Sequence, residues 1–323
     1  MKVLVTGANG FTGSHLVRAL EQQGNSVVGL VRKSSNLTRL SDCHLQLVYG
    51  DITDRDALRV AITGVDTVFH TAAYVEWGLV NEAEMEQVNV GGTQAVLEVA
   101  QAVNISKVVY CSTIGVFGNT NGQVIDETFK RTQTDFSSAY ERTKYLAQQL
   151  VDQFAASGLP VVSILPTGIF GPDDPHFGPV MQQFLRGRLL LWVGGARITG
   201  IVHVDDLVGA MILAAEKGLP GEHYIISAGE LTIREMFEIL SQETGIPVPR
   251  EAPKPLVRLT GNLLEPIGRA FKWQPPLSRE RVHNIYDRCI RVDSTKARQK
   301  LGWQPRSVSE TLREIVRIIE AES

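Results

Sequence analysis

The stretch Thr6-Gly7-Ala8-Asn9-Gly10-Phe11-Thr12-Gly13 decides the fold of this chain. It follows a β-branched apolar run at Val3–Val5 and opens a segment with helical spacing at Phe11–Gln23. Glycines let such a turn be tight and let its backbone approach a pyrophosphate, and the start of a helix adds unpaired N–H groups and a positive dipole end. The order of strand, glycine turn and helix therefore favours a dinucleotide site over a simple chain reversal. The predicted cofactor contacts in the turn are Gly7, Asn9, Gly10, Phe11, Thr12 and Gly13.

The same alternation continues through the first 170 residues. Short apolar runs recur up to Val161–Leu165, and longer segments with helical spacing, such as Glu82–Val103 and Phe136–Ser157, separate them. Continuous apolar strands separated by amphipathic helices are typical of a parallel sheet covered on both faces. Right-handed crossovers make such a sheet doubly wound. We predict an α/β fold: a doubly wound parallel sheet (Rossmann) with a smaller, mostly helical C-terminal substrate lobe.

The pattern changes after Leu165. A turn-rich PDDPH stretch occupies Pro172–His176, and three glycines fall within Gly194–Gly200. Ile201–Glu216 then returns to strand followed by helix, and Glu222–Ile226 is predicted as one more strand. We therefore predict a dinucleotide-binding domain at 1–170 with 201–228 returning to it, and a substrate-binding lobe formed mainly by 171–200 and 229–323.

Composition narrows the function classes. The chain has 323 residues, of which 43% are hydrophobic and 21% charged, as in ordinary soluble folded proteins. A net charge of −3 gives no strong field for nucleic acid or acidic membranes, and no apolar run approaches the ~18 residues of a spanning helix. Because Lys2–Thr6 already has the pattern of a strand, we expect no signal peptide. Three widely spaced cysteines and scattered histidines predict neither disulfides nor a metal site. We expect a cytoplasmic protein whose partner is a small molecule, with no nucleic-acid, membrane or metal partner.

The end of the second predicted strand bears on the choice of nucleotide. NAD sites usually place an acidic residue there to hold the ribose diol. Here the strand from Val27 ends in Arg32-Lys33, with no acid. A guanidinium grips a phosphate in bidentate fashion, so these cations favour NADP, while NAD and a merely solvated loop stay as alternatives.

A tyrosine and a lysine stand four residues apart within Phe136–Ser157. Residues at this spacing project from one face of a helix, so the Tyr140 phenol and the Lys144 ammonium point into one pocket. A neighbouring cation lowers a tyrosine pKa from ~10 towards working pH, which makes Tyr140 a candidate general acid or base. The triplet Cys111-Ser112-Thr113 ends the strand Lys107–Tyr110 at the sheet edge where doubly wound folds bind ligands, and it offers a candidate group for fixing the substrate oxygen.

Taken together, these pieces give a resemblance that covers nearly the whole chain. The chain resembles the extended short-chain dehydrogenases/reductases, and most closely their dihydroflavonol reductase-like and 3β-hydroxysteroid dehydrogenase-like branches. The matching motifs are TGANGFTG (6–13), GDITD (50–54), VFHTAA (68–73), VNVGGT (88–93), CSTIGVFG (111–118), YERTK (140–144), PTGIFGP (166–172), HVDDL (203–207) and DSTKARQKLGW (293–303).

The resemblance implies roles for particular residues. Asp51 and Ile52 would contact the adenine, and Ala72 and His70 would lie along the nicotinamide side. Thr113 would partner Tyr140, Lys144 would also bind the nicotinamide ribose, and Asn89 would support the site. His203, Asp205 and Asp206 would be structural, and the long helices would form a homodimer. The cofactor contacts completed by the family motifs are Asp51, Ile52, Ala72, Ala73, Tyr140, Lys144 and Pro166.

The chain departs from the family's nucleotide-sugar enzymes. Thr167-Gly168 replaces their Arg-x-x-Asn-type pattern, Phe170 replaces a tyrosine, and the Gly194–Gly200 loop lacks their Arg-Asp-Phe run. Aromatic residues outnumber charged ones in the loops expected to meet substrate, and no arginine cluster that would bind a diphosphate is evident. We therefore favour a small or medium-sized apolar carbonyl compound. The candidate substrate contacts are Tyr74, Trp77, His176 and Trp192, with a core position as the alternative for Trp192.

The predicted function is NADP(H)-dependent reduction of a carbonyl, or oxidation of the alcohol, with Tyr140 as acid or base. One alternative is a nucleotide-sugar epimerase or dehydratase that retains NAD(P). Another is a non-catalytic, dinucleotide-sensing regulator, and the presence of both Tyr140 and Lys144 argues against it.

Overall fold

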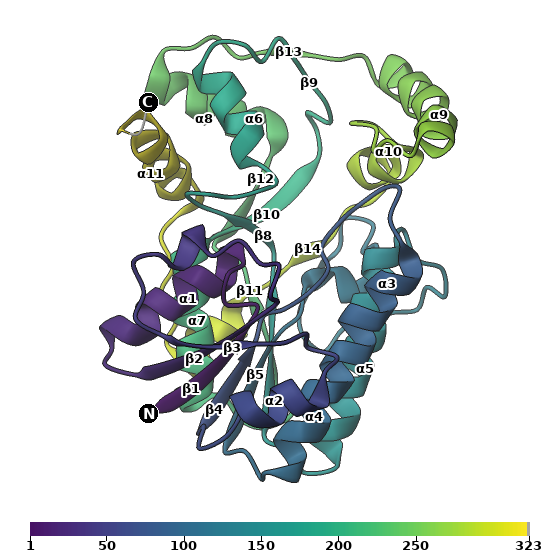
Figure 1. Cartoon of the computed structure of the whole chain (residues 1–323). Helices are drawn as coiled ribbons and strands as arrows, with labels where there is room; N and C mark the ends of the chain where they lie inside the picture. Colours follow the sequence, from purple (N-terminus) through teal and green to yellow (C-terminus); the bar gives the residue numbers. More distant parts are fainter. Residues whose placement is uncertain (322–323) are drawn as a thin grey trace.

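A computed structural model describes residues 1–321. Its larger lobe is built on a seven-stranded parallel sheet in the order β11-β7-β5-β4-β1-β2-β3 (Figure 1). The strand order reverses beside β1, which pairs with both β2 and β4, and ligands bind at such switch points. The strands are β1 (Lys2–Thr6), β2 (Ser26–Val31), β3 (Gln46–Tyr49), β4 (Thr67–His70), β5 (Lys107–Cys111), β7 (Val161–Pro166) and β11 (His223–Ile226).

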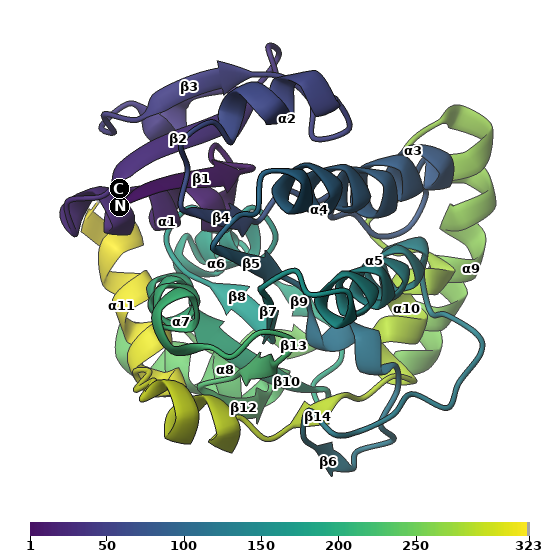
Figure 2. The same ribbon diagram turned by 90° about the horizontal axis from the view of Figure 1, so that it is seen from below.

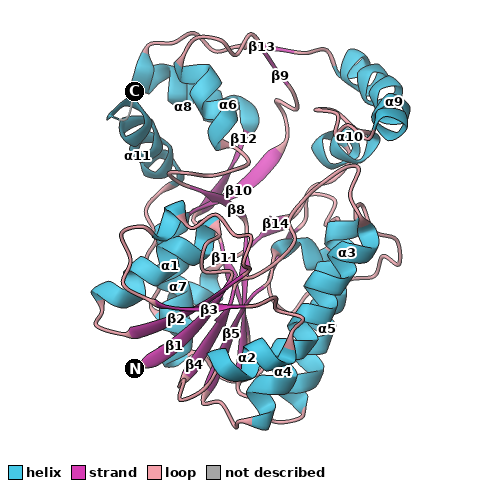
Figure 3. Cartoon of the chain, in the orientation of Figure 1, coloured by secondary structure: helices cyan, strands magenta, loops and turns pink. Residues whose placement is uncertain are grey.

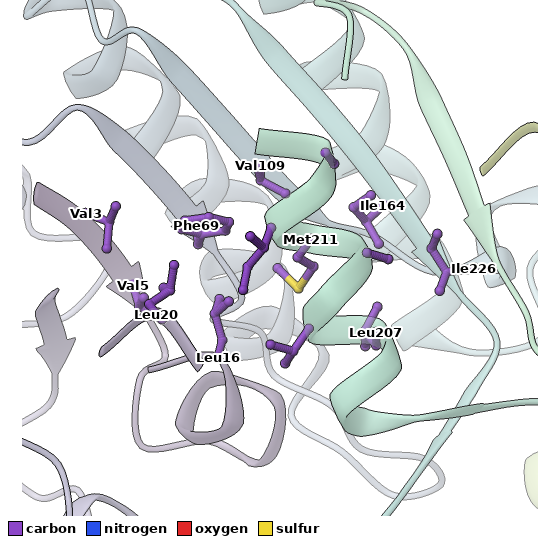
Figure 4. Close-up of a cluster of buried hydrophobic side chains, with 14 of the residues drawn as sticks. Val3, Val5, Leu16, Leu20, Phe69, Val109, Ile164, Leu207, Met211 and Ile226 are labelled. Carbon is purple, nitrogen blue, oxygen red and sulfur yellow. The ribbon is translucent and has the colours of Figure 1, made fainter. Parts of the chain in front are cut away.

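Helices cover both faces of this sheet (Figures 1 and 2). On one face, Leu16 and Leu20 of α1 and Leu207 and Met211 of α7 pack against the strands (Figure 4). Each such side chain contributes about 1.5–3 kcal/mol by leaving water. The helices on this face are α1 (Phe11–Gln22) and α7 (Val204–Lys217), and those on the other are α2 (Arg55–Ala61), α4 (Thr93–Ala102) and α5 (Ala139–Ala156).

These elements confirm the predicted doubly wound sheet, with one refinement. The single helix expected over Glu82–Val103 is divided into α3 (Glu82–Glu86), a π-helical turn η2 (Gln87–Gly92) and α4. The extra residue in a π turn rotates the following side chains, and here the turn contains the buried Asn89.

The smaller lobe contains a three-stranded sheet and most of the remaining helices (Figure 3). Its core holds Phe184, Phe237 and Trp192. Helices α9 and α10 pack on each other at one side (Figures 1 and 2). The elements of this lobe are β8 (Gly168–Phe170), α6 (Gly178–Leu185), β9 (Leu191–Trp192), β10 (Ile198–His203), β12 (Gly229–Thr232), α8 (Ile233–Thr244), β13 (Arg250–Glu251), α9 (Lys254–Phe271), α10 (Arg279–Tyr286) and α11 (Val308–Ala321).

The chain crosses between the lobes several times. After β14 (Arg291–Val292), which pairs with β6 (Val124–Ile125), the π turn η4 (Ala297–Leu301) packs into the core beneath α7. Trp303 joins that core and donates its indole N–H to the Asp206 carbonyl at 2.8 Å. Residues 297–303 therefore pack with the larger lobe, although the sequence pattern assigned them to the smaller one. Two short 3₁₀ turns complete the fold, η1 (Thr38–Leu40) and η3 (Ile114–Phe117).

None of the described helices combines the length and the apolar character needed to cross a bilayer.

Candidate active site

The glycine turn between β1 and α1 brings backbone close to backbone. Gly7 has φ +70°, and a Cβ atom there would lie 2.8 Å from the Ala72 Cα. A Cβ at Gly13 would lie 2.1 Å from the Gly7 carbonyl oxygen, so no side chain fits. Gly10 precedes the first turn of α1 and has no capping side chain, which leaves the first N–H groups of the helix for a ligand. This cradle fits a pyrophosphate.

A cavity of about 480 Å³ runs from this turn to the ends of β2 and β3. Arg32 lines it, is exposed, and has no carboxylate within 4.0 Å in the described part of the chain. Ser35, which the sequence reasoning missed, lines it beside Arg32, whereas Lys33 lines neither this cavity nor the next. The predicted residues that the structure gathers here are Gly7, Asn9, Gly10, Arg32, Asp51, Ile52, Ala72, Ala73 and Tyr74.

A second cavity of about 680 Å³ continues from the first and reaches into the smaller lobe. Gly7, Gly10 and Ala73 line both cavities, so the two adjoin along the glycine turn. An elongated dinucleotide that begins near Arg32 would thus end beside Tyr140. The other predicted residues that line the second cavity are Phe11, Thr12, Gly13, Trp77, Thr113, Tyr140, Lys144, Pro166 and His176.

Tyr140 lies in the first turn of α5. The Ser138 side chain caps this helix by accepting the Glu141 N–H at 3.0 Å, which fixes where the helix begins. Tyr140 and Thr113 line the same cavity, and the Trp77 ring packs edge-on against the phenol with centroids 5.7 Å apart. Burial raises the pKa of Tyr140, and the Lys144 charge opposes that rise. The net direction is opposite to the one predicted, because desolvation outweighs the cation.

Lys144 is buried one helical turn further along α5. Its Nζ donates to the Cys111 carbonyl at 2.8 Å and to the Tyr110 hydroxyl at 2.9 Å. Burial lowers its pKa. An ammonium has three N–H donors, so one is left to point at a ligand. The structure thus brings Thr113, Tyr140 and Lys144 together as the sequence predicts.

A buried network supports the loop that follows β4. Asn89 accepts the Tyr74 N–H at 2.7 Å and donates to the Tyr74 carbonyl and the Thr143 hydroxyl, each at 3.0 Å. His70 lies deeper, between Thr6 (2.7 Å) and Thr93 (3.0 Å), and burial lowers its pKa to about 3. The expectation that His70 lies along the nicotinamide is therefore wrong: it is a neutral residue that supports the cavity wall from behind.

Two other predicted substrate contacts, Trp192 and Tyr74, lie outside the cavity that contains Tyr140. Trp192 is buried in the core of the smaller lobe, where it packs on Phe237 with centroids 4.9 Å apart and donates to the Pro249 carbonyl at 2.6 Å. The core alternative is thus the correct one for Trp192. Tyr74 lines the first cavity and not the one that contains Tyr140. Trp77 and His176 do lie in the second cavity, with ring centroids 5.4 Å apart.

The sequence reasoning missed a group of arginines beside Tyr140. The buried Glu141 carboxylate lies between Arg131 (2.6 Å) and Arg288 (2.9 Å). Arg288 and Arg197 both line the second cavity. A signal existed at one of them, since Arg197 stands within the glycine-rich loop Gly194–Gly200, but nothing in the sequence indicated that it lines the same cavity as Arg288.

Comparison with known proteins agrees with this geometry. The model of the NAD dependent epimerase/dehydratase family matches residues 3–227. Sterol demethylase protein B of Methylococcus capsulatus is 33% identical over 95% of this chain and 94% of its own length. A 4-hydroxy-2-methyl-3-oxo-4-farnesyl-3,4-dihydroquinoline-1-oxide ketoreductase of Stigmatella aurantiaca is 31% identical over 95% of this chain and 92% of its own length. A 2-alkyl-3-oxoalkanoate reductase of Stenotrophomonas maltophilia is 31% identical over 98% of each chain. Among solved structures, UDP-glucose 4-epimerase of Thermotoga maritima superposes with a TM-score of 0.81 at 26% identity, covering 100% of this chain and 99% of that one.

Proposed function

This chain belongs to the NAD-dependent epimerase/dehydratase family of extended short-chain dehydrogenases/reductases, and from that premise we propose that it reduces the carbonyl group of a small or medium-sized organic compound with NADP(H). The observation that carries the proposal is that Tyr140, Thr113 and the buried Lys144 all line one cavity, which is continuous with the glycine turn. Two of the relatives are named as reductases of oxo compounds, which supports the same reaction type.

The residues of this chain have separate roles in the proposed reduction. Tyr140 and Thr113 hold the substrate's carbonyl oxygen, and Tyr140 gives it a proton as the C=O double bond becomes an alcohol. Lys144 stabilises the phenolate that Tyr140 becomes. Gly7, Gly10 and the start of α1 hold the diphosphate. A reduced nicotinamide, when bound, supplies the hydride to the carbonyl carbon.

The choice of NADP rests on the first cavity. Arg32 lines it beside Ser35, and its guanidinium has no carboxylate partner among residues 1–321. A bound 2′-phosphate would provide that partner. Arg32→Ala should therefore weaken NADPH binding about ten- to a hundredfold and change NADH binding little. Lys33→Ala is the matched control, since Lys33 is an exposed neighbour outside the cavity. Equal losses for NADPH and NADH in Arg32→Ala would overturn the choice.

The reaction itself is tested by the loss of NADPH absorbance with a panel of aliphatic and cyclic ketones and oxo acids. We expect NADPH to be consumed in proportion to the alcohol formed. Tyr140→Phe should abolish turnover and leave NADPH affinity nearly intact, because the phenylalanine keeps the packing with Trp77. Interconversion of sugar nucleotides with no net NADPH consumption would establish the epimerase alternative instead. We also retain the homodimer implied by the family, with α4 and α5 as its contact.

A further inference from the structure

The second cavity holds positive charge that ketone reduction alone does not use. Arg197 comes from the loop before β10, and Arg288 from the segment between α10 and β14. Both line the cavity that contains Tyr140 and Thr113. Burial lowers the pKa of both guanidiniums, and the charge of Arg288 lowers the pKa of Arg197 further. The chain has thus placed two like charges in the wall of one partly desolvated cavity.

Three acidic residues line the cavity, Glu76, Glu141 and Asp174, and none of them pairs with Arg197; Glu76 lies 3.8 Å from Arg281. Glu141 is one carboxylate between two guanidiniums, those of Arg131 and Arg288. Arg197 has no carboxylate within 4.0 Å in the described part of the chain. Asp174 also lines the cavity, but its carboxylate accepts the backbone N–H groups of His176 and Phe177 at 2.8 and 3.2 Å. Like charges that are close and poorly solvated raise the free energy of the folded protein unless an anion joins them.

Three buried polar atoms around the same space have no protein partner. They are Arg288 Nε, Thr199 Oγ1 and Ser112 Oγ, and all three residues line the cavity. An unpaired buried donor or acceptor costs about 1–3 kcal/mol, so such groups are commonly satisfied by ligand or by water. Two arginines and a threonine hydroxyl together form a donor set for an oxyanion.

The rest of the cavity wall indicates what the anion is attached to. Ile114, Ile198 and Ile290 line it together with Trp77. Arg288 pairs at 2.9 Å with Glu141, the residue that follows Tyr140, and both Arg288 and Tyr140 line this cavity. A ligand that satisfies both has its negative group close to its carbonyl and an apolar remainder.

We propose that Arg197 and Arg288 bind a substrate carboxylate beside the carbonyl that Tyr140 protonates, so that the substrate class is an oxo acid with an apolar chain. The planar guanidinium fork matches a carboxylate in two hydrogen bonds. This inference rests on the proposed carbonyl reduction, whose Tyr140 defines where the carbonyl lies. It differs from a diphosphate site because the carboxylate adjoins the reacting carbon.

Binding is measured first, in the absence of turnover. A failure of the carboxylate site can then be distinguished from a failure of the proposed reaction. Octanoate, octanamide and octyl phosphate are titrated by calorimetry into the protein saturated with NADP⁺. We expect octanoate to bind about ten- to a hundredfold more tightly than octanamide. Arg197→Gln should remove that preference and leave octanamide binding unchanged. Arg234→Gln is the matched control, because it removes the same charge from a surface arginine that pairs with Glu251 outside the cavity.

Each result decides the inference. Equal affinity for octanoate and octanamide, or an Arg197→Gln variant that keeps the preference, overturns it. Octyl phosphate binding far more tightly than octanoate overturns the assignment to a carboxylate. If octanoate binds as expected but no ketone or oxo acid is reduced, the anion site stands and the proposed function fails. Arg288→Lys provides a second variant that keeps the charge beside Glu141, and we expect it to weaken octanoate through loss of the fork.

A separate observation concerns the outside of α9. Leu256, Leu259, Leu263 and Ile267 follow one another at helical spacing and are 46–57% exposed, and Phe271, 79% exposed, continues the line. The segment 250–281 contains seven Lys or Arg and three Asp or Glu, a net charge of +4 in a chain of −3. We call the five apolar residues the α9 stripe.

We infer that the α9 stripe lies on an anionic membrane surface, contrary to the expectation of no membrane partner that the net charge of the whole chain suggested. Arg258, Arg269 and Arg281 already pair with carboxylates, but Lys254 and Lys272, at the two ends of α9, are exposed and have no carboxylate within 4.0 Å among residues 1–321. An apolar helix face with such cations, and with aromatic residues at one end, is the composition of helices that rest in the headgroup region. The helix also adjoins the active site: Gln274, just after α9, donates to the Trp77 carbonyl, and Trp77 packs on Tyr140. A substrate with an apolar chain could thus pass from the bilayer to the second cavity.

The test uses the full chain with vesicles of phosphatidylcholine, with and without phosphatidylglycerol. We expect sedimentation with the anionic vesicles, weakened by salt, and at least about tenfold weaker binding for Leu259→Glu/Leu263→Glu. Leu190→Glu/Leu219→Glu is the control, because both leucines are exposed elsewhere. Failure to sediment overturns the inference. So does a stripe variant that turns a dimer into a monomer with unchanged vesicle binding, since the stripe would then contact a second copy.

Discussion

Replacing Lys144 by methionine should separate catalysis from stability. Lys144 is buried, and the folded protein lowers its pKa, so the charged form is less favourable there than in the unfolded chain. By linkage, the protonated ammonium destabilises the fold below its folded pKa, and this penalty fades as pH rises through that pKa. Methionine keeps the length of the side chain and removes the penalty at neutral pH.

The magnitude follows from the contacts that are lost. The two hydrogen bonds from the ammonium, to Cys111 O and Tyr110 OH, are worth about 1.5–3 kcal/mol each. Removing a buried charge returns several kcal/mol. The two effects largely cancel, so we expect the free energy of unfolding to change by less than about 2 kcal/mol. Turnover should fall about 10²–10⁴-fold, because the Tyr140 phenolate loses its cation.

The assay pairs NADPH consumption with urea unfolding, on the wild type, Lys144→Met and Lys107→Met. Lys107 is the control: its pKa is also lowered by burial, and it donates to the Gly218 carbonyl at 2.7 Å, but it lies at the far end of β5. Turnover of Lys144→Met within about threefold of wild type would refute the reasoning. An equal loss of turnover in both variants would also refute it.

Two further predictions concern the cradle and its support. Gly13→Ala should reduce NADPH affinity at least about a hundredfold in a fluorescence titration, since its Cβ would lie 2.1 Å from Gly7 O. Gly209→Ala in α7, where nothing lies within 4 Å of the added atom, should keep the affinity and raise stability by about 0.5–1 kcal/mol. Asn89→Leu leaves the Tyr74 N–H and C=O unpaired and should lower stability by about 2–4 kcal/mol in urea unfolding, with a raised KM for substrate. Wild-type stability in Asn89→Leu would show that the Tyr74 loop finds other partners.

Local sequence patterns predicted much of the fold of the larger lobe. The periodicity of the sequence reveals the buried strands and the helices of the larger lobe, because each element keeps the same pattern of buried positions along its length. The glycine turn and the Tyr140–Lys144 spacing are local as well, and the structure brings them to one cavity. The division of Glu82–Val103 at the π turn escaped prediction, since one turn with i→i+5 hydrogen bonds in place of i→i+4 leaves no clear mark in the apolar spacing.

Features that depend on packing between distant segments could not be predicted. The pKa of Tyr140 depends on how completely Trp77 and the smaller lobe exclude water, and no spacing in the sequence records this. Arg197 and Arg288 line one cavity only because the fold brings the loop before β10 and the segment before β14 to the same place. Trp192 and Trp77 look alike in sequence, yet one fills a core and the other lines the site.

The repeated passage of the chain between the lobes restricts how the enzyme can admit its ligands. A hinge needs only a few connecting segments that bend together, but here the chain crosses between the lobes several times. The half-buried Arg306 also joins Asp206 of α7, at 3.1 Å, to Glu314 of α11 in the smaller lobe. Swinging the lobes apart would break these ion pairs. Ligands therefore enter and leave through movements of side chains and short loops at the cavity mouth, above all in the segment from Tyr74 to Leu79. Turnover should then respond to substitutions in that segment more than to solvent viscosity, as expected when a gate is small and the frame around it is rigid.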